Sequence, residues 1–239
     1  MTAYLAKFIS SIKNRYWSYR IIFVPETIGA ISYLNKNEKK IKKIKFGLVI
    51  SNVGGKGNFS YKKSFQPNHF LNFLIKDIFK KERIKLKEYN FDINGSDERQ
   101  YSSQFFKINT CSIHKDKYYN FKEYHSSKDN LNFVKSKNIF QSLLLYQKLI
   151  EKLENQIIYQ SKITKGEVML SKYNLYTKLG GNFVPKKNSW TQTDLILWII
   201  FLSDGNRTID QIASNLNVRK QIITKLYHIL TKKKLVERI

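Results

Sequence analysis

Two neighbouring stretches decide the fold: FGLVIS at residues 46–51 and NHFLNFLIKDIFKK at residues 68–81. The first is a short apolar run, which predicts a buried strand. The second places Phe70, Leu74 and Ile78 at spacings of four, which predicts a helix with one broad apolar face. A strand followed by a helix that can cover it is the repeating unit of a parallel or mixed sheet with helices on both faces.

The same alternation continues on both sides of these stretches. We expect further strands at residues 16–24, 84–91 and 108–113. We expect further helices at residues 2–13, 27–34 and 136–159. The pattern therefore predicts an α/β domain over residues 1–160, with a parallel or mixed sheet covered by helices.

The C-terminal residues form a separate pattern. Residues 191–202, 209–216 and 220–232 read as helices, residues 204–206 as a turn and residues 235–236 as a terminal strand. Helix, turn, helix, turn, helix, strand is the order of a small winged-helix module. We therefore expect a winged-helix domain at residues 190–239, joined to the α/β domain by a connector at residues 161–189.

Composition limits the class of protein. Apolar residues make up 42% of the 239 residues, which excludes a fully disordered chain. The longest apolar run, residues 195–202, is far shorter than the ~20 residues of a membrane helix, so we expect no membrane span and a cytoplasmic protein. Cys111 is the single cysteine, which excludes an internal disulfide and a cysteine-rich zinc site. Its apolar neighbours indicate a buried structural thiol.

The net charge of +25 comes mainly from lysine, with 36 lysines and only 7 arginines. The lysines are spread along the chain, and the bias toward Lys, Ile and Asn is what AT-rich codons produce. Diffuse lysine raises non-specific attraction to polyanions at low salt. We therefore expect no specific nucleic-acid partner.

Three polar clusters could carry chemistry. Glu26 follows an expected strand, where it is either a general base or metal ligand, or a cap of the next helix. The second cluster, GSDERQ at residues 95–100, reads on its own as a turn with a helix N-cap. His125 lies in a loop, where it is either a metal ligand or simply exposed.

The remaining glycine and histidine features indicate structural roles. GGKG at residues 54–57 lacks the Gly-Lys-Ser/Thr ending of a P-loop, so we interpret it as a turn and not a phosphate cradle. His69, His114 and His228 have no acidic or imidazole partner nearby in the sequence. We therefore expect these three histidines to be structural.

Three longer stretches point to a family: YWSYRIIFVPETIGAISYL, GSDERQYSSQFFKINTCSIHKDKY and FKEYHSSKDNLNFV, which begin at residues 16, 95 and 121. Together they resemble a bacterial aminopeptidase-like family of the zinc exopeptidase clan, which also contains glutaminyl cyclases. Members of that family often carry a C-terminal winged helix. The resemblance covers nearly the whole chain.

The resemblance implies a phosphorylase/hydrolase-like mixed sheet that holds zinc at its strand ends and acts on a peptide or amide substrate. Glu26 matches the general base that deprotonates zinc-bound water. His125 matches an imidazole position, and Asp97 an acidic position, that are expected to bind the metal. The residues implied to bind substrate are Glu98, Arg99 and Tyr124.

Two departures from the family pattern affect the expected metal. The clan places a second carboxylate where this chain has Thr27, and an Asp where it has Ser51-Asn52, so we expect one zinc ion and not two. Family members also carry a His-Pro segment and an Asn-Asp-Asn segment upstream of the first helix, and neither occurs here. We therefore expect a truncated product or one half of a split pair, with weak zinc binding and doubtful activity on its own.

Two other functions are kept as alternatives. A DNA-binding regulator would use the last long helix, with Arg219, Lys220 and Lys225 near phosphates. Because base-reading side chains are few there, a protein partner is the preferred role for the winged helix. The second alternative is an accessory protein of a polysaccharide pathway, which follows only from where such family members tend to be encoded.

Overall fold

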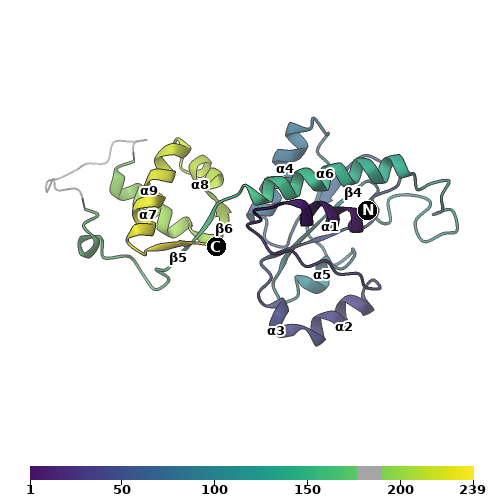
Figure 1. Ribbon diagram of the computed structural model, residues 1–239, viewed down its shortest axis with the longest axis horizontal. Helices are drawn as coiled ribbons and strands as arrows, with labels where there is room; N and C mark the ends of the chain where they lie inside the picture. Colours follow the sequence, from purple (N-terminus) through teal and green to yellow (C-terminus); the bar gives the residue numbers. More distant parts are fainter. Residues whose placement is uncertain (177–189) are drawn as a thin grey trace. The chain divides into compact units, whose positions relative to one another are not determined.

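The computed structural model describes residues 1–176 and 190–239, which form two compact units, Met1–Asn155 and Gln156–Ile239 (Figure 1). The first unit is a mixed α/β domain and the second a winged helix-turn-helix, which confirms the predicted fold class. Part of the expected connector, residues 177–189, lies outside the described residues.

The first unit is built on a four-stranded sheet with the order β1-β4-β2-β3. The strands are β1 (Phe46–Val49), β2 (Ser60–Lys62), β3 (Glu88–Tyr89) and β4 (Asn109–His114). Strand β4 pairs in parallel with β1 and antiparallel with β2, while β2 and β3 are parallel, so the sheet is mixed. All six residues of β4 are buried, because this strand lies between two others and under helices.

Helices lie on both sides of this sheet (Figure 1). One side carries α1 (Thr2–Ser11), α4 (Phe70–Lys81) and α6 (Ser136–Glu154), and the other carries α2 (Ile28–Lys36), α3 (Glu38–Ile41) and α5 (Glu98–Tyr101). The Tyr146 hydroxyl of α6 accepts from the N–H of Ile113 at 3.1 Å and donates to its carbonyl at 2.9 Å. This buried tyrosine therefore fixes the longest helix on the central strand.

The strand predicted at residues 16–24 is wrong. The segment belongs to no sheet, and the Phe23 side chain is 72% exposed. The Trp17 indole donates to the Leu153 carbonyl at 3.3 Å, so the segment packs on the end of α6 and makes no ladder. Strand propensity depends on the available neighbours, and here tertiary contacts override it.

The other boundary differences have similar causes. The strand expected at residues 84–91 is reduced to the two residues of β3. The helix expected to run to residue 159 ends at Glu154, because Ile158–Ser161 form β5, a strand of the second unit. Apolar residues that continue a helical spacing over one turn fit a strand equally well.

The second unit contains a three-stranded antiparallel sheet. Its central strand is β5, which lies between β6 (Asp204–Thr208) and β7 (Val236–Arg238). The expected turn at residues 204–206 is part of β6. Its helices are α7 (Gln192–Leu202), α8 (Ile209–Asn215) and α9 (Lys220–Lys232), preceded by a 3₁₀ turn, η1 (Leu170–Tyr173).

Capping and packing explain why this unit folds as it does. Thr191 with Asp194, and Thr208 with Gln211, form capping boxes that start α7 and α8. Apolar residues from all three helices share one core, including the fully buried residues Ile196, Ile199, Ile212, Ile223 and Leu230. Among the described residues of the chain, no helix is both long and apolar enough to cross a bilayer.

Candidate functional site

A strained turn follows the candidate base Glu26. Thr27 has φ 61° and ψ −73°, and the N–H of Ile28 donates to the Glu26 carbonyl at 2.8 Å. This is a γ-turn with positive φ, a rare conformation that costs about 1–3 kcal/mol and tends to occur at functional sites. Helix α2 begins after Thr27 without a side-chain cap, so the alternative role of Glu26 as a helix cap is not seen. The Glu26 side chain is exposed.

Asp97 reaches this turn from a distant part of the chain. Its Oδ1 accepts from the N–H of Thr27 at 2.8 Å, across 70 residues of sequence. It makes no capping bond to α5, so the interpretation of GSDERQ as an ordinary capped turn is wrong. Burial raises the pKa of Asp97, the Thr27 bond lowers it, and the charges of Glu26 and Glu98 raise it further. The carboxylates of Glu26 and Asp97 are therefore close enough to repel each other.

A third segment brings Tyr124 and His125 to the same place. Burial is the main cause of the raised pKa of Tyr124, Tyr119 adds to it, and the charge of Glu26 contributes as well. The His125 ring is exposed and stacks on Tyr124 at 4.0 Å between centroids. His125 also has a positive φ, 53°, as Thr27 does. The charge of Glu26 thus acts on side chains of two other segments, and two residues of this region, Thr27 and His125, have positive φ.

Glu98, expected to bind substrate, is fully buried. Its Oε1 accepts from the Ser112 hydroxyl at 2.6 Å and from the Tyr118 hydroxyl at 2.8 Å. Because a fully buried carboxylate cannot reach a ligand in solvent, its geometry fits an anchor for the loop that carries Asp97. Arg99 is exposed and donates to the Ile93 carbonyl at 3.1 Å, which leaves its guanidinium near the surface.

A buried lysine holds the other end of that loop. Lys62 of β2 is fully buried, and its Nζ donates to the carbonyls of Asp92 at 3.0 Å and Asn94 at 2.6 Å. The Asp92 carboxylate lies 3.2 Å from the same Nζ, which pairs the charge. Buried charges persist only when they are paired and hydrogen-bonded, so this lysine fixes residues 92–94 on the sheet.

Two of the histidines expected to be structural are buried. The Nδ1 atom of His69 accepts from the N–H of Leu71 at 3.2 Å and caps α4, and burial lowers the pKa of His69 to about 3. His114 lies between the rings of Tyr89 and Tyr118, and neither of its nitrogens has a hydrogen-bond partner in the described residues. Burial, helped by nearby lysines, lowers the pKa of His114 to about 4.

The glycine loop at residues 54–57 packs around a carboxylate of the protein itself. A Cβ atom on Gly55 or Gly57 would collide with the Asp116 carboxylate, and the N–H of Gly57 donates to Asp116 Oδ2 at 3.2 Å. A carboxylate in this position would repel a phosphate. The loop is therefore a turn, as predicted, whose glycines make room for Asp116.

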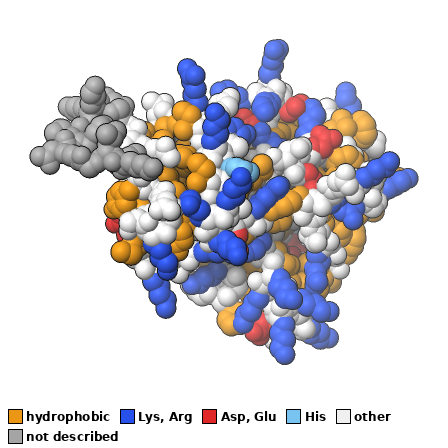
Figure 2. Space-filling model, turned by 60° about the vertical axis from the view of Figure 1, so that its left-hand side comes forward, with side chains coloured by type: hydrophobic (Ala, Val, Ile, Leu, Met, Phe, Trp, Pro, Cys, Tyr) orange, Lys and Arg blue, Asp and Glu red, His pale blue; other side chains and the backbone are white. Residues whose placement is uncertain are grey.

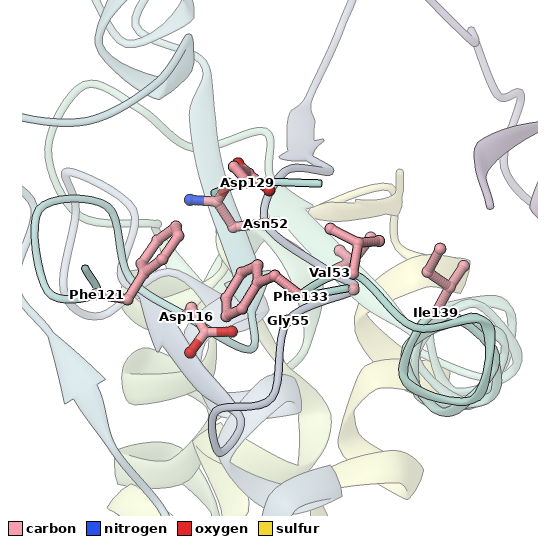
Figure 3. Close-up of a pocket in the computed structure, with 10 residues that line it drawn as sticks. Asn52, Val53, Gly55, Asp116, Phe121, Asp129, Phe133 and Ile139 are labelled. Carbon is pink, nitrogen blue, oxygen red and sulfur yellow. The ribbon is translucent and has the colours of Figure 1, made fainter. Parts of the chain in front are cut away.

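A cavity of about 230 Å³ lies beside this loop (Figure 3). Its polar lining consists of Asn52, Asp116 and Asp129, and its apolar lining includes Phe121 and Phe133. Asn52 was named from the sequence only as a departure from the family pattern. Asp116 and Asp129 were not predicted, because Asp116 stands in a lysine-rich run and Asp129 in a polar loop. The signal that would have found Asp116 is the pair of glycines that its carboxylate requires.

Both units of the chain match known protein families. Residues 1–156 match the family described as a domain of unknown function, DUF4910. The chain belongs to the DUF4910 family. Residues 157–238 match a winged helix-turn-helix family.

Two relatives of this DUF4910 chain carry names that refer to an aminopeptidase-like domain or a peptidase. A Clostridium acetobutylicum protein, named for polysaccharide biosynthesis and an aminopeptidase-like domain, is 32% identical over 213 residues, which cover 89% of this chain and 48% of the relative. A crystal structure from the same organism, named as a peptidase, matches all of the chain and 52% of its own length, with 28% identity and a TM-score of 0.65. The chain spans about half the length of these relatives.

The residues present do not fit a zinc ion by themselves. Within residues 1–176 and 190–239, no group of three or more His, Cys, Asp or Glu side chains is placed to hold a metal. Catalytic zinc normally takes three protein ligands. Asp97 and His125 lie in the same region, but they do not complete such a set. Cys111 is fully buried, and its pKa is raised to about 12 by burial, so it does not supply the missing ligand.

The basic residues of the second unit lie on the surface. Arg219, Lys220 and Lys225 are exposed at the start of α9 and along it, and Lys220 pairs with Asp210 at 2.8 Å. On the face shown in Figure 2, lysines and arginines are scattered and do not gather into one patch. This distribution agrees with the diffuse lysine of the sequence.

Proposed function

We propose that this DUF4910 chain contributes part of the active site of a zinc-dependent, aminopeptidase-like hydrolase that cleaves an N-terminal peptide or amide bond. One observation carries the proposal: Asp97 accepts from the N–H of the strained Thr27 turn, and the charge of Glu26 acts on both Asp97 and Tyr124, the ring on which His125 stacks. Those residues match three family stretches that are far apart in the sequence. The names of the two relatives support the same class of activity.

The roles follow from exposure and charge. Glu26 is exposed beside other carboxylates and would accept the proton of the attacking water. Asp97 and His125 are the oxygen and nitrogen donors that this chain would offer to a metal, and a bound metal would supply a Lewis acid for the scissile carbonyl. Because these donors do not complete a zinc site, we propose that further ligands come from polypeptide outside these 239 residues.

The test joins this chain to the segments of the Clostridium relative that it does not match, and replaces Glu26 by Gln. Turnover of a fluorogenic aminoacyl amide should fall by about 10²–10⁴-fold, with zinc content unchanged, as expected for loss of a general base. Glu38→Gln is the matched control, since Glu38 is an exposed carboxylate paired with Lys42. Parent turnover in Glu26→Gln would remove Glu26 from the mechanism, and loss of zinc would make it a ligand.

We further propose that the winged helix contacts a protein partner. Trp190, Trp198 and Phe201 are 46%, 39% and 75% exposed, and their rings make edge contacts with one another. Such an aromatic group on the surface is more typical of a protein contact than of a phosphate-binding surface. The test is a pull-down that compares the parent with a soluble double variant, Phe201→Ser with Trp198→Ser. If the variant retains every protein that binds the parent, this role of the winged helix is contradicted.

A further inference from the structure

The cavity beside the glycine loop is the size of one side chain. Its volume of about 230 Å³ is many times the roughly 10–15 Å³ that a cavity needs to hold one water molecule, so a group of several heavy atoms fits. It begins where β1 ends, at Asn52 and Val53, and its other walls come from residues 116–139. In α/β sheets, ligands bind outside the carboxyl ends of strands, which is the position of this cavity.

The walls are largely apolar. The rings of Phe121 and Phe133 stack with their centroids 5.3 Å apart and their planes at 10°. Val53, Val134 and Ile139 line the cavity as well, with Val53 and Ile139 together on the side away from Phe121 (Figure 3). Such walls favour a hydrocarbon stem over a strongly hydrated group.

Two carboxylates give the cavity a negative charge in a chain of net charge +25. Asp116 and Asp129 both line it, and neither has an ion-pair partner among the described residues. The charge of the adjacent Lys115 acts on Asp116, but its Nζ forms no ion pair with that carboxylate: it donates to Gln141 at 2.8 Å and lies 4.6 Å from the Phe59 ring centroid. A cation is therefore the group that these carboxylates would attract.

Aromatic rings connect the cavity with the candidate site. Phe121 of the cavity makes an edge contact with Tyr124 at 5.4 Å, and Tyr124 stacks on His125 at 4.0 Å. Tyr124 also lies within range of the Glu26 charge. A ligand held in the cavity is thus one aromatic residue away from the side chains proposed to do chemistry.

We propose that this cavity binds a primary ammonium group carried on a short aliphatic stem, as in a lysine or ornithine side chain. The stem lies against Phe121 and Phe133, and the ammonium meets Asp116 and Asp129. In the proposed hydrolase, on which this last step rests, the cavity selects a basic first residue of the substrate.

The test measures binding of lysinamide and norleucinamide to the full 239-residue chain by calorimetry, in the presence of EDTA. The two probes share the α-ammonium and the carbon stem, and only lysinamide has the terminal ammonium. Lysinamide should bind about tenfold more tightly, and Asp129→Asn should remove most of this difference. Asp129 is exposed, so this variant should fold, and Asp116→Asn should act in the same direction. Asp210→Asn, in the second unit, removes one carboxylate elsewhere and should change nothing.

Three results would overturn the proposal: equal binding of the two probes, an Asp129→Asn variant that keeps the parent preference, or an Asp210→Asn variant that loses it. In a separate titration without EDTA, binding of zinc that Asp129→Asn abolishes, together with no preference for lysinamide, would overturn the proposal and reassign the cavity as a metal site. Because this assay needs neither metal nor turnover, its failure leaves the Glu26→Gln test of the proposed hydrolase intact, and the reverse also holds.

Discussion

Replacing His114 by Phe should make the first unit less sensitive to acid. His114 is 1% exposed, and its pKa is lowered from the ordinary 6.5 to about 4, first by burial and then by Lys117, Lys62 and Lys87. Between these two pH values the unfolded chain binds a proton that the folded chain does not bind. Stability is therefore fully present above about pH 6.5 and is lost as the pH falls toward 4.

The size of the effect follows from the same values. One pKa unit corresponds to about 1.4 kcal/mol, and pH 5 lies about 1.5 units below the ordinary pKa of histidine. His114 should thus account for about 2 kcal/mol of the stability lost between pH 7 and pH 5. Phe keeps an aromatic ring between Tyr89 and Tyr118, whose centroids lie 6.2 and 5.5 Å from that of His114.

Urea unfolding of the full chain at pH 7 and pH 5 measures this difference directly. The loss of unfolding free energy between the two pH values should be smaller in His114→Phe than in the parent by about 2 kcal/mol. Tyr89→Phe is the control, because it changes a neighbouring ring by one hydroxyl and keeps the imidazole. A His114→Phe variant with the acid sensitivity of the parent would refute the reasoning.

Three further outcomes are expected. Asp97→Ala should lower the unfolding free energy by about 1–3 kcal/mol and speed hydrogen exchange of the Thr27 amide, because it removes the acceptor of that N–H. Asp97→Asn keeps an acceptor and should have a smaller effect on both quantities. Unchanged exchange of the Thr27 amide in Asp97→Ala would contradict the hydrogen bond between these residues. Tyr146→Phe should lower the unfolding free energy by about 1–3 kcal/mol, because it leaves the Ile113 N–H unpaired. The control Tyr4→Phe, at a 69% exposed position, should lower it by less than about 0.5 kcal/mol. Equal losses in the two variants would refute the role assigned to Tyr146. Binding to a mixed-sequence DNA duplex should be non-specific and fall steeply with salt, and a strong preference for one sequence at physiological salt would support a regulator instead.

The amphipathic helices were the most predictable part of the fold. Helix α4 lies within its predicted range, because its apolar residues repeat at three and four positions. The strand predicted at residues 16–24 failed because an apolar, aromatic run says nothing about which backbone lies beside it. Here the neighbour is the end of α6, which offers the Leu153 carbonyl as an acceptor but no strand edge.

The sequence predicted which residues belong to the candidate site, but not how they contact one another. The sequence could nominate Glu26, Asp97 and His125 from the family stretches, but the bond from Thr27 to Asp97 joins residues 70 positions apart and leaves no mark in local spacing. The burial of Glu98 was also hidden, since an acidic residue in a polar loop normally faces solvent. Asp116 and Asp129 of the cavity were missed because each looks ordinary in its own segment.

The zinc content and activity of the isolated chain test whether Glu26, Asp97 and His125 form part of a zinc hydrolase site that other polypeptide completes. The purified chain is dialysed against zinc, and metal stoichiometry and aminopeptidase turnover are then measured. We expect weak, substoichiometric zinc binding and no turnover, because two donors fall short of the three that catalytic zinc normally takes. Tight one-to-one zinc with robust turnover would contradict it and show that these residues form a complete site.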